Sequence, residues 1–354
     1  MLRKALLLLA LVVLALACAA YVRGGRPYEV YRTAGRILAL SADDRGVFWL
    51  EGDANSGDVG AAAFALDGGQ GTARQVLAQP NLVSLASAGE ALVLLQRSGA
   101  TGALLSVPRH GGGPTPVAEG LSHPVGLTVA GGEAFWTETA PRLIPGVRHV
   151  PATQARVMLR AARLDGSGGS RTVAWLNGGT REFVGELLGA QGERLFVLEV
   201  VAGDANEGWS RVVAAPTAGG ATETLARSQG PQLGLLTRDA VYWTGPSEDA
   251  GEPLSARALF GGPPGAIPSA PLTDWLPPFG KLCETGGRVY MGASDGVWRV
   301  PERRGLPVQV VEGPFPARDV AAYGGGLYFS GGPGILLHRA LTVSARLRTG
   351  LRIR

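Results

Sequence analysis

The sequence predicts an all-β fold: a seven-bladed β-propeller preceded by an N-terminal hydrophobic helix for export or anchoring. Three observations lead to this prediction. The chain opens with an apolar run, one short pattern recurs about seven times after it, and 54 glycines and 24 prolines are spread through the 354 residues. Evenly spread glycine and proline indicate many tight turns between short strands. Because 45% of the residues are hydrophobic and 18% are charged, the chain can also bury a large core.

Residues 1–25 have the pattern of an export segment. Arg3 and Lys4 precede an unbroken apolar run, which is typical of a secretory signal or a signal anchor. Three outcomes remain open: signal cleavage after the small residues, an uncleaved helix, since the 18 residues Ala5–Val22 just span a bilayer, or lipidation. The lipidated residue would be Cys18, because the preceding Ala-Leu-Ala resembles a bacterial lipobox. We therefore expect an extracytoplasmic protein of the periplasm, outer membrane or cell surface that contacts the membrane through this segment.

A short pattern recurs through the rest of the chain. An aliphatic residue, an aromatic residue and a second large apolar residue follow one another, as in Val47-Phe48-Trp49. The central positions of the copies are 48, 93, 135, 196, 242, 290 and 328. Their spacings run from 38 to 48 residues apart from one of 61, and a period in the forties is that of a propeller blade. The copy at Leu92–Leu94 lacks the aromatic residue, so six or eight blades are alternatives to seven.

The context of each copy predicts four antiparallel strands. A segment of small apolar residues such as Pro124–Leu127 lies upstream and suits an innermost strand, where the blades crowd the axis. Downstream, a strand ends in a glycine turn such as Leu164-Asp165-Gly166, and Asp-Gly favours a two-residue hairpin. A short outer strand completes the unit. The propeller is expected over residues 26–345, followed by a basic tail at residues 346–354.

Ring closure matters because an open propeller leaves a free strand edge. Tyr28–Arg32 alternates like an outer strand, whereas the last repeat has only three clear strands and no glycine turn after the third. The sequence therefore predicts that residues 28–34 complete the last blade. The alternative donor is Thr342–Leu347.

Some of these segments resemble a known family. Three of them are similar to the YWTD-type propellers of lipoprotein-receptor ectodomains and their bacterial relatives: Pro124–Leu127, Ala134–Glu138 and Arg163–Gly166. The nearest match to the motif itself is Val241–Thr244, although Gly245 stands where the family has an acid. The likeness covers residues 28–340 loosely, with seven copies where the family usually has six. The resemblance implies a propeller fold and an extracellular binding role, and it implies no active site.

No motif in the sequence predicts catalysis. Gly292–Gly296 matches G-x-S-x-G, but it lies between two expected strands, whereas a nucleophile elbow needs a strand-to-helix turn. We interpret it as a hairpin turn. Cys283 is expected to lack a disulfide partner because the other cysteine lies in the export segment. The four histidines lack metal-ligand spacing, and the net charge of +4 does not form the basic stripe that nucleic-acid binding needs.

The candidate binding surface is the loop face, meaning the face with the loops between the second and third strands and the entries into each innermost strand. Loops on a rigid scaffold usually carry function. The candidate residues on this face are Asp53, Asn55, Asp58, Arg142, Arg148, His149, Asp204, Asn206, Glu248 and Asp249. The two Gly-Asp-Ala-Asn loops among them supply oxygen ligands suited to Ca²⁺, but they lack a later bidentate Glu and the same residues are ordinary in turns. A solvated rim without a partner is the other interpretation.

Two functions follow from these observations. The preferred one is an exported cell-envelope propeller that acts as a non-catalytic binding or scaffold module without a cofactor, for a protein, peptide or glycan. The alternative is a Ca²⁺-dependent propeller hydrolase, lactonase or lyase with its site at the channel mouth. The residues that could contribute to such a site are Asn81, His123, Glu182, Glu186 and Asp319. A purely structural lipoprotein is the third hypothesis.

Overall fold

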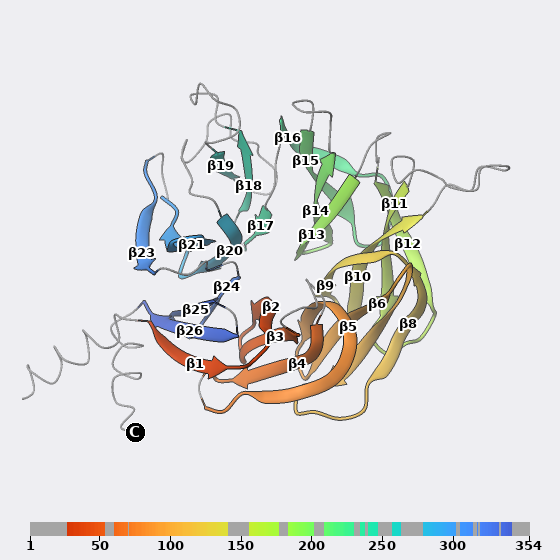
Figure 1. Ribbon diagram of the computed structural model, residues 1–354. Coiled ribbons are helices and arrows are strands. Elements are labelled where there is room, and N and C mark those ends of the chain that lie inside the picture. Colours follow the sequence, from red (N-terminus) through yellow and green to blue (C-terminus); the bar gives the residue numbers. More distant parts are fainter. Residues whose placement is uncertain are drawn as a thin grey trace, which may run out of the picture.

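The protein folds as a propeller of β-sheets arranged around a central axis, as its computed structural model shows (Figure 1). The structure describes residues 27–53, 60–69, 71–140, 156–176, 183–201, 209–229, 234–237, 240–246, 257–262, 279–301, 305–313, 317, 319–332 and 334–341. All regular structure in these ranges is strand. None of the described residues belongs to a helix that is long and apolar enough to cross a bilayer. The expected helix at residues 1–25 and the tail at residues 346–354 lie outside these ranges.

Apart from the first strand of the chain, the strands before residue 177 form two sheets. The first, of seven strands, contains β2 (Arg36–Ala42), β3 (Gly46–Gly52), β4 (Gly60–Asp67), β5 (Arg74–Ala88), β6 (Ala91–Ser98), β7 (Thr101–Pro108) and β8 (Thr115–Ser122). The second contains β9 (Pro124–Ala130), β10 (Glu133–Ala140), β11 (Arg156–Arg163) and β12 (Ser170–Leu176).

The remaining strands form four further sheets with the same up-and-down order. The first two contain β13 (Phe183–Gln191), β14 (Arg194–Val201), β15 (Trp209–Pro216) and β16 (Glu223–Gln229), then β17 (Gly234–Leu236), β18 (Val241–Pro246) and β19 (Arg257–Gly262). The last two contain β20 (Phe279–Thr285), β21 (Arg288–Ala293), β22 (Gly296–Arg299) and β23 (Val308–Glu312), then β24 (Val320–Tyr323), β25 (Gly326–Ser330), β26 (Ile335–Ala340) and β1 (Tyr28–Arg32). The G-x-S-x-G match is therefore the hairpin between β21 and β22.

The long strand β5 serves two repeats and merges their strands into the seven-stranded sheet. Its first part pairs with β4, where Ala78 lies opposite Ala62, and its second part pairs with β6, where Leu85 lies opposite Leu94. Between these parts Asn81 adopts a φ of 67°, a left-handed conformation that Asn tolerates better than most residues. His123, with a φ of 42°, stands at the corresponding point between β8 and β9. Both residues thus lie where the chain passes from an outer strand to an innermost one.

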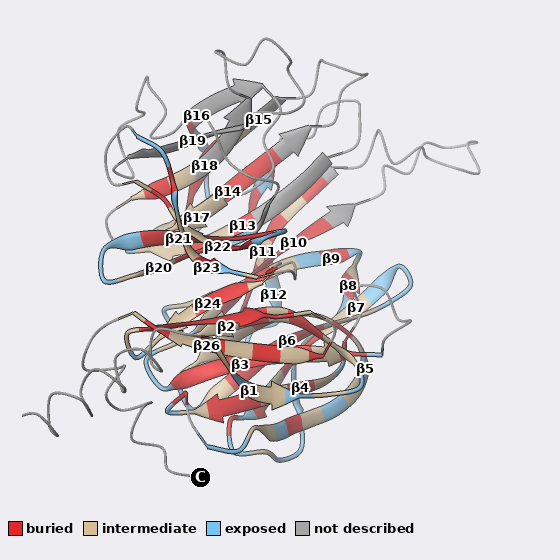
Figure 2. Ribbon diagram, turned by 60° about the vertical axis from the view of Figure 1, so that its left-hand side comes forward, coloured by how far each residue is buried: buried red, intermediate tan, exposed pale blue. Residues whose placement is uncertain are grey.

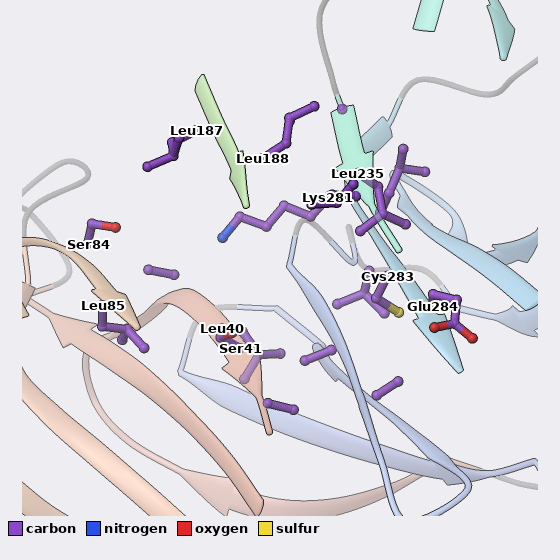
Figure 3. Close-up of a pocket in the computed structure, with 18 of the residues that line it drawn as sticks. Leu40, Ser41, Ser84, Leu85, Leu187, Leu188, Leu235, Lys281, Cys283 and Glu284 are labelled. Atoms are coloured by element: carbon purple, nitrogen blue, oxygen red, sulfur yellow. The ribbon is translucent and has the colours of Figure 1, made fainter. Parts of the chain in front are cut away.

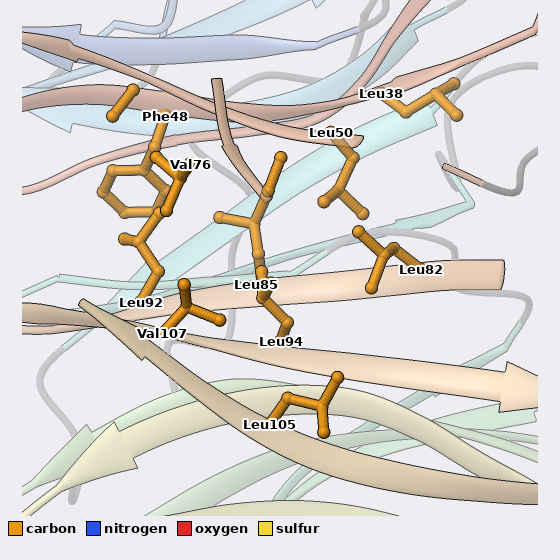
Figure 4. Packing of buried hydrophobic residues seen from close by; sticks show 12 residues of the cluster. Leu38, Phe48, Leu50, Val76, Leu82, Leu85, Leu92, Leu94, Leu105 and Val107 are labelled. Atoms are coloured by element: carbon orange, nitrogen blue, oxygen red, sulfur yellow. The ribbon is translucent and has the colours of Figure 1, made fainter. Parts of the chain in front are cut away.

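The core lies between neighbouring sheets, and the repeated pattern explains why. In β3, Phe48 and Leu50 pack into the cluster shared with β5, β6 and β7 (Figure 4), whereas Val47 and Trp49 pack against Tyr328 and its neighbours in the last sheet. Alternate residues of a strand point to opposite faces. A second strand covered on both faces must therefore be apolar at every position. Figure 2 shows the resulting buried stretches along β3 and β6.

The start and the end of the described chain meet in one sheet. β1 pairs antiparallel with β26, with Tyr28 opposite His338 (Figure 1). The Tyr328 hydroxyl donates a 2.6 Å hydrogen bond to the carbonyl oxygen of Gly69, which ties this sheet to the first one. Gly69 has a φ of 62°, and a Cβ there would collide with the Tyr328 hydroxyl, so glycine is required at this contact. The pairing also covers the outer edge of β26.

The antiparallel order gives the propeller two different faces. The loop face carries the entries into the innermost strands and the connections between second and third strands. The opposite face, called the turn face below, carries the turns between first and second strands, such as residues 43–45, and between third and fourth strands, such as residues 68–73. Most residues of the turn face are described, whereas many loop-face residues lie outside the described ranges.

Candidate functional site

A central cavity of ≈ 480 Å³ is enclosed by the innermost strands. Its walls come from β2, β5, β9, β13, β17, β20 and β24, each the first strand of a repeat. They are mainly aliphatic, and the leucines among them are Leu40, Leu85, Leu127, Leu187, Leu188, Leu235, Leu236 and Leu282 (Figure 3). Small residues such as Gly126 and Gly234 let these strands approach the axis. Because several of these leucines, such as Leu40 and Leu85, are buried between the sheets, polar atoms form more of the surface that faces the cavity than apolar atoms do.

The charged groups of this cavity are engaged with each other or with the backbone. Lys281 extends across the cavity (Figure 3), and its Nζ lies 3.1 Å from Oδ1 of Asp319. Glu284 Oε1 accepts a 2.7 Å hydrogen bond from the backbone N–H of Gly287. Lys281 is one of only two lysines among 33 basic residues, so its place in the channel is distinctive. Its flexible stem and compact charge differ from the planar guanidinium used elsewhere in the chain.

The described channel residues do not converge as a calcium site requires. Ca²⁺ takes six to eight oxygen ligands. Asp319 is engaged by Lys281, and Asn81 and His123 lie at the bends that enter two innermost strands. Glu186 belongs to β13, but its side chain is not described, and Glu182 lies outside the described ranges. In the part of the chain that the structure describes, no three His, Cys, Asp or Glu side chains gather as metal ligands would.

Cys283 also lines the cavity, and burial decides its chemistry. Its side chain is 8% exposed, and it is a free thiol. Burial, followed by the nearby charge of Glu284, raises the pKa of the Cys283 thiol far above its ordinary value. The thiol is therefore protonated at neutral pH and is a poor nucleophile.

Of the predicted loop-face residues, Asp53 alone lies within the described ranges. It is exposed at the end of β3. The others lie outside these ranges, namely Asn55, Asp58, Arg142, Arg148, His149, Asp204, Asn206, Glu248 and Asp249. Cys18, the candidate for lipidation, lies outside them as well.

The sequence analysis did not predict a set of polar residues on the second strands. They stand three positions after the centre of the repeated pattern in four successive repeats: Glu51, Gln96, Glu138 and Glu199. Glu138 is 6% exposed and Glu199 is fully buried. Buried polar groups of this kind need partners, because removing them from water is costly. Their regular spacing from the centre of the repeated pattern is the signal by which they could have been found.

Each of these four side chains has a partner within the described structure. The Tyr31 hydroxyl donates to Glu51 Oε2 at 2.8 Å, and burial together with this bond raises the pKa of Tyr31 well above its ordinary value. Gln79 Nε2 donates to Gln96 Oε1 at 3.0 Å. Trp136 Nε1 donates to Glu138 Oε1 at 2.7 Å, and Arg211 Nε donates to Glu199. These hydrogen bonds hold the strand ends that support the loop face.

Comparison with solved structures places the chain among propellers. It matches an oligogalacturonate lyase from Vibrio parahaemolyticus with a TM-score of 0.61 at 9% identity, over 88% of this chain and 90% of that one. It matches the β-propeller domain of the Trilobed protease from Pyrococcus furiosus with a TM-score of 0.58 at 8% identity, over 88% and 97% of the two chains. A puromycin-hydrolyzing peptidase from Mycobacterium tuberculosis matches with a TM-score of 0.55 at 14% identity, over 85% of this chain.

These likenesses define the class of protein. The present chain spans 50% of the length of the M. tuberculosis peptidase. No protein-family model matches the sequence, and no curated protein matches it. At identities this low, similarity of structure shows the fold and leaves function to the residues of the chain itself. The protein is an all-β propeller.

Proposed function

We propose that this chain is an exported, seven-bladed propeller that serves in the cell envelope as a non-catalytic binding module for a protein, peptide or glycan. Seven copies of the sequence pattern support the blade number. So do the seven innermost strands around one cavity, since β5 acts as the outer strand of one repeat and the innermost strand of the next.

The observation that carries the binding role is the composition of the central cavity. Eight of its twenty lining residues are leucines, and the charged atoms of Lys281 and Glu284 have partners in the chain, Asp319 in the case of Lys281. Aliphatic side chains together with a few placed polar groups are the usual lining of a ligand-binding pocket. A ligand would enter from the loop face, where Asp53 is exposed.

The N-terminal segment supports the cellular address. A basic pair followed by an apolar run directs export, and the propeller would then lie outside the cytoplasm. The mature protein would have a different mass after each of the three outcomes, which are cleavage, lipidation at Cys18 and retention as a membrane helix. Intact mass analysis of the protein from fractionated cells distinguishes these outcomes, and recovery of the full chain in the cytoplasm contradicts export.

Capture from envelope extracts tests the binding role when it is coupled to a variant that fills the cavity. Ser84→Trp places an indole in the channel, whereas Thr115→Trp adds the same group at an exposed position on an outer strand. We expect the wild type and Thr115→Trp to recover the same ligand and Ser84→Trp to lose it. Recovery of nothing specific, or equal recovery by Ser84→Trp, contradicts the proposal.

The alternative is a propeller lyase or hydrolase with a channel-mouth metal, and the structural likeness to an oligogalacturonate lyase favours it. Glu182 and Glu186 would then supply carboxylates near the mouth. This function predicts bound Ca²⁺ in the purified protein and a rise in unfolding temperature when Ca²⁺ is added. Absence of both effects contradicts the enzymatic alternative.

A further inference from the structure

The closing strand β1 is less deeply buried than the outer strands of two other sheets, β8 and β12. None of its five residues is fully buried, whereas β8 and β12 each bury apolar side chains. It pairs with β26, which lies near the other end of the sequence, and the pairing shifts register between Glu29 and Tyr31 (Figure 1). Local opening begins where few apolar contacts are buried. Because no hairpin joins β1 to β26, it can leave the sheet without moving another strand.

Two side chains at the end of β1 bind one carboxylate of the first repeat. The Tyr31 hydroxyl donates to Glu51 Oε2 at 2.8 Å, and Thr33 Oγ1 donates to Glu51 Oε1. The backbone N–H of Thr33 also donates to the carbonyl oxygen of Gly334 at 2.8 Å. Since Glu51 lies on β3, the side-chain bonds join the strand that closes the ring to the first repeat. We call residues 28–33 the latch.

The indole of Trp49 is buried beside the latch. Trp49 precedes Glu51 by two residues on β3, and its side chain is fully buried. Its ring lies 5.1 Å from the Tyr31 ring, measured between centroids, and stacks on Phe64. Among the residues that the structure describes, none accepts a hydrogen bond from Trp49 Nε1. A buried donor without an acceptor destabilises a fold, so such a group needs an explanation.

The third repeat shows which acceptor suits this tryptophan. Trp136 and Glu138 stand on β10 at the same two positions of their repeat. Trp136 Nε1 donates to Glu138 Oε1 at 2.7 Å, and both side chains are buried. Residues two apart on a strand point to the same face, so Glu51 stands beside Trp49 in the same way. In the first repeat, however, the oxygens of Glu51 accept hydrogen bonds from the latch.

We propose that the latch is a releasable device in which two sets of donors compete for Glu51. In the closed state Glu51 accepts from the latch, and within the described structure the Trp49 indole lacks an acceptor. In the released state β1 leaves β26, and Glu51 turns to accept from Trp49 Nε1. This new bond offsets part of the loss of the old ones, which lowers the free energy of release. Release uncovers the edge of β26 and so opens the ring.

The position of the latch in the chain suggests what the device couples. The latch directly follows residues 1–25, which the sequence predicts to be an export or anchoring segment. A pull or a binding event at that segment reaches β1 before any other strand, so the device would link the state of the N-terminus to closure of the ring. Tyr31, Thr33, Trp49 and Glu51 do not line the central cavity, so the device is independent of the proposed binding function.

Nuclear magnetic resonance of the full-length protein, isotope-labelled in its tryptophans, tests the exchange of partners. A hydrogen-bonded indole N–H resonates downfield of one without an acceptor, and Trp49→Phe identifies the Trp49 signal. The double variant Tyr31→Phe/Thr33→Val removes both side-chain donors of the latch. We expect it to move the Trp49 signal downfield. Adding Glu51→Ala to the double variant should reverse this shift, because the new acceptor is then missing.

Hydrogen exchange measured by mass spectrometry reports the release of β1 itself. The amides of β1 should exchange about tenfold or more faster in the double variant than in the wild type, while those of β25 keep their rate. Tyr328→Phe is the matched control, because it removes the same hydroxyl from the last sheet, where it donates to Gly69 and not to Glu51. The control should leave the Trp49 signal and the exchange of β1 close to wild type. Tyr31→Phe alone replaces the double variant if the latter does not fold.

Four results overturn the proposal. Unchanged exchange of β1 in the double variant would show that Tyr31 and Thr33 do not hold the latch closed. Faster exchange of β1 without a shift of the Trp49 signal would show that the strand opens without an exchange of partners. A shift that persists after Glu51→Ala, or the same shift in Tyr328→Phe, would show that Glu51 is not the acceptor that Trp49 gains.

Discussion

Two regions of this propeller have the same strand order but differ in the polar side chains on their second strands. In the N-terminal region, residues 28–229, the second strands carry Glu51, Gln96, Glu138 and Glu199 after the apolar pattern, and each side chain is hydrogen-bonded. In the C-terminal region, residues 234–341, the corresponding positions are Gly245, Ala293 and Gly331. The C-terminal region keeps the same strand order without these polar groups. The apolar pattern therefore suffices for the strand order.

The regions also differ in charge on the turn face. Arg109 in the N-terminal region lies among carboxylates of the chain, whereas Arg299 in the C-terminal region faces a cavity with other arginines. A buried ion pair is costly to break from one side, because the remaining charge loses its partner. The difference predicts that similar substitutions change the free energy of unfolding by different amounts in the two regions.

The largest expected effect compares these two arginines. Arg109→Gln leaves Asp43 and Asp67 without their shared cation, so we expect it to lower the free energy of unfolding by about 3–5 kcal/mol. Arg299→Gln replaces a half-buried side chain on β22 and should change the free energy of unfolding by less than about 1 kcal/mol. Urea unfolding of both variants gives the comparison. Equal losses would show that the two arginines have the same structural role.

The acid dependence of stability follows from the same cluster. Burial alone would raise the pKa values of Asp43 and Asp67, but hydrogen bonds from Arg109 and its neighbours bring both below their ordinary range. A lowered carboxyl pKa contributes stability above the unfolded value of about 4, and this contribution is lost as pH falls through the folded value. The urea midpoint of the wild type should therefore drop more between pH 5 and pH 3 than that of Arg109→Gln. Parallel drops would contradict this assignment.

A smaller effect is expected at the buried acids of the N-terminal region. Glu138→Ala leaves Trp136 Nε1 without its acceptor and should lower the free energy of unfolding by about 1–3 kcal/mol. Glu138→Gln keeps an acceptor oxygen and should cost less than Glu138→Ala. Thermal unfolding of the two variants measures the difference. A larger loss in Glu138→Gln would mean that the carboxylate charge, and not the acceptor atom, is required.

The smallest expected effect lies at the seam where the two regions meet. Tyr328→Phe removes the hydrogen bond to the carbonyl oxygen of Gly69 and should lower the free energy of unfolding by about 0.5–1.5 kcal/mol. Gly69→Ala should cost more, because it adds a Cβ at positive φ against the Tyr328 hydroxyl and the Tyr323 ring. Urea unfolding ranks the two variants. A Tyr328→Phe loss as large as that of Gly69→Ala would contradict this account of the contact.

The local pattern predicted the strands well because it reflects burial on both faces. Val47-Phe48-Trp49 marked β3, and the glycine turn at Gly166 marked the link between β11 and β12. The prediction of an all-β propeller is confirmed, while the blade number remains part of the proposal. The alternation of Tyr28–Arg32 predicted an outer strand, and in the structure β1 pairs with β26. The sharing of β5 between two repeats was not visible locally, because it depends on the bend at Asn81.

The candidate sites were harder to predict than the strands. The loop-face residues were chosen from turn composition, and Asp53 is the member that the structure describes. The buried acids and the cavity lined by Arg288, Arg299 and Arg339 were not predicted. Arg288, Arg299 and Arg339 stand on three strands of two sheets, and no spacing in the sequence relates them.

The sequence by itself determined the repeat and the positions of most strands, because both depend on hydrophobicity and turn chemistry within a few residues. The export segment stays a prediction from the same kind of local pattern. Tertiary structure alone decided which charges meet. It placed Lys281 across the channel beside Asp319, enclosed Arg109 between two carboxylates and gathered three arginines around one cavity. The physical reason is that these groupings arise from the packing of one sheet against the next. Side chains that are distant along the chain become neighbours only when the ring of sheets has formed.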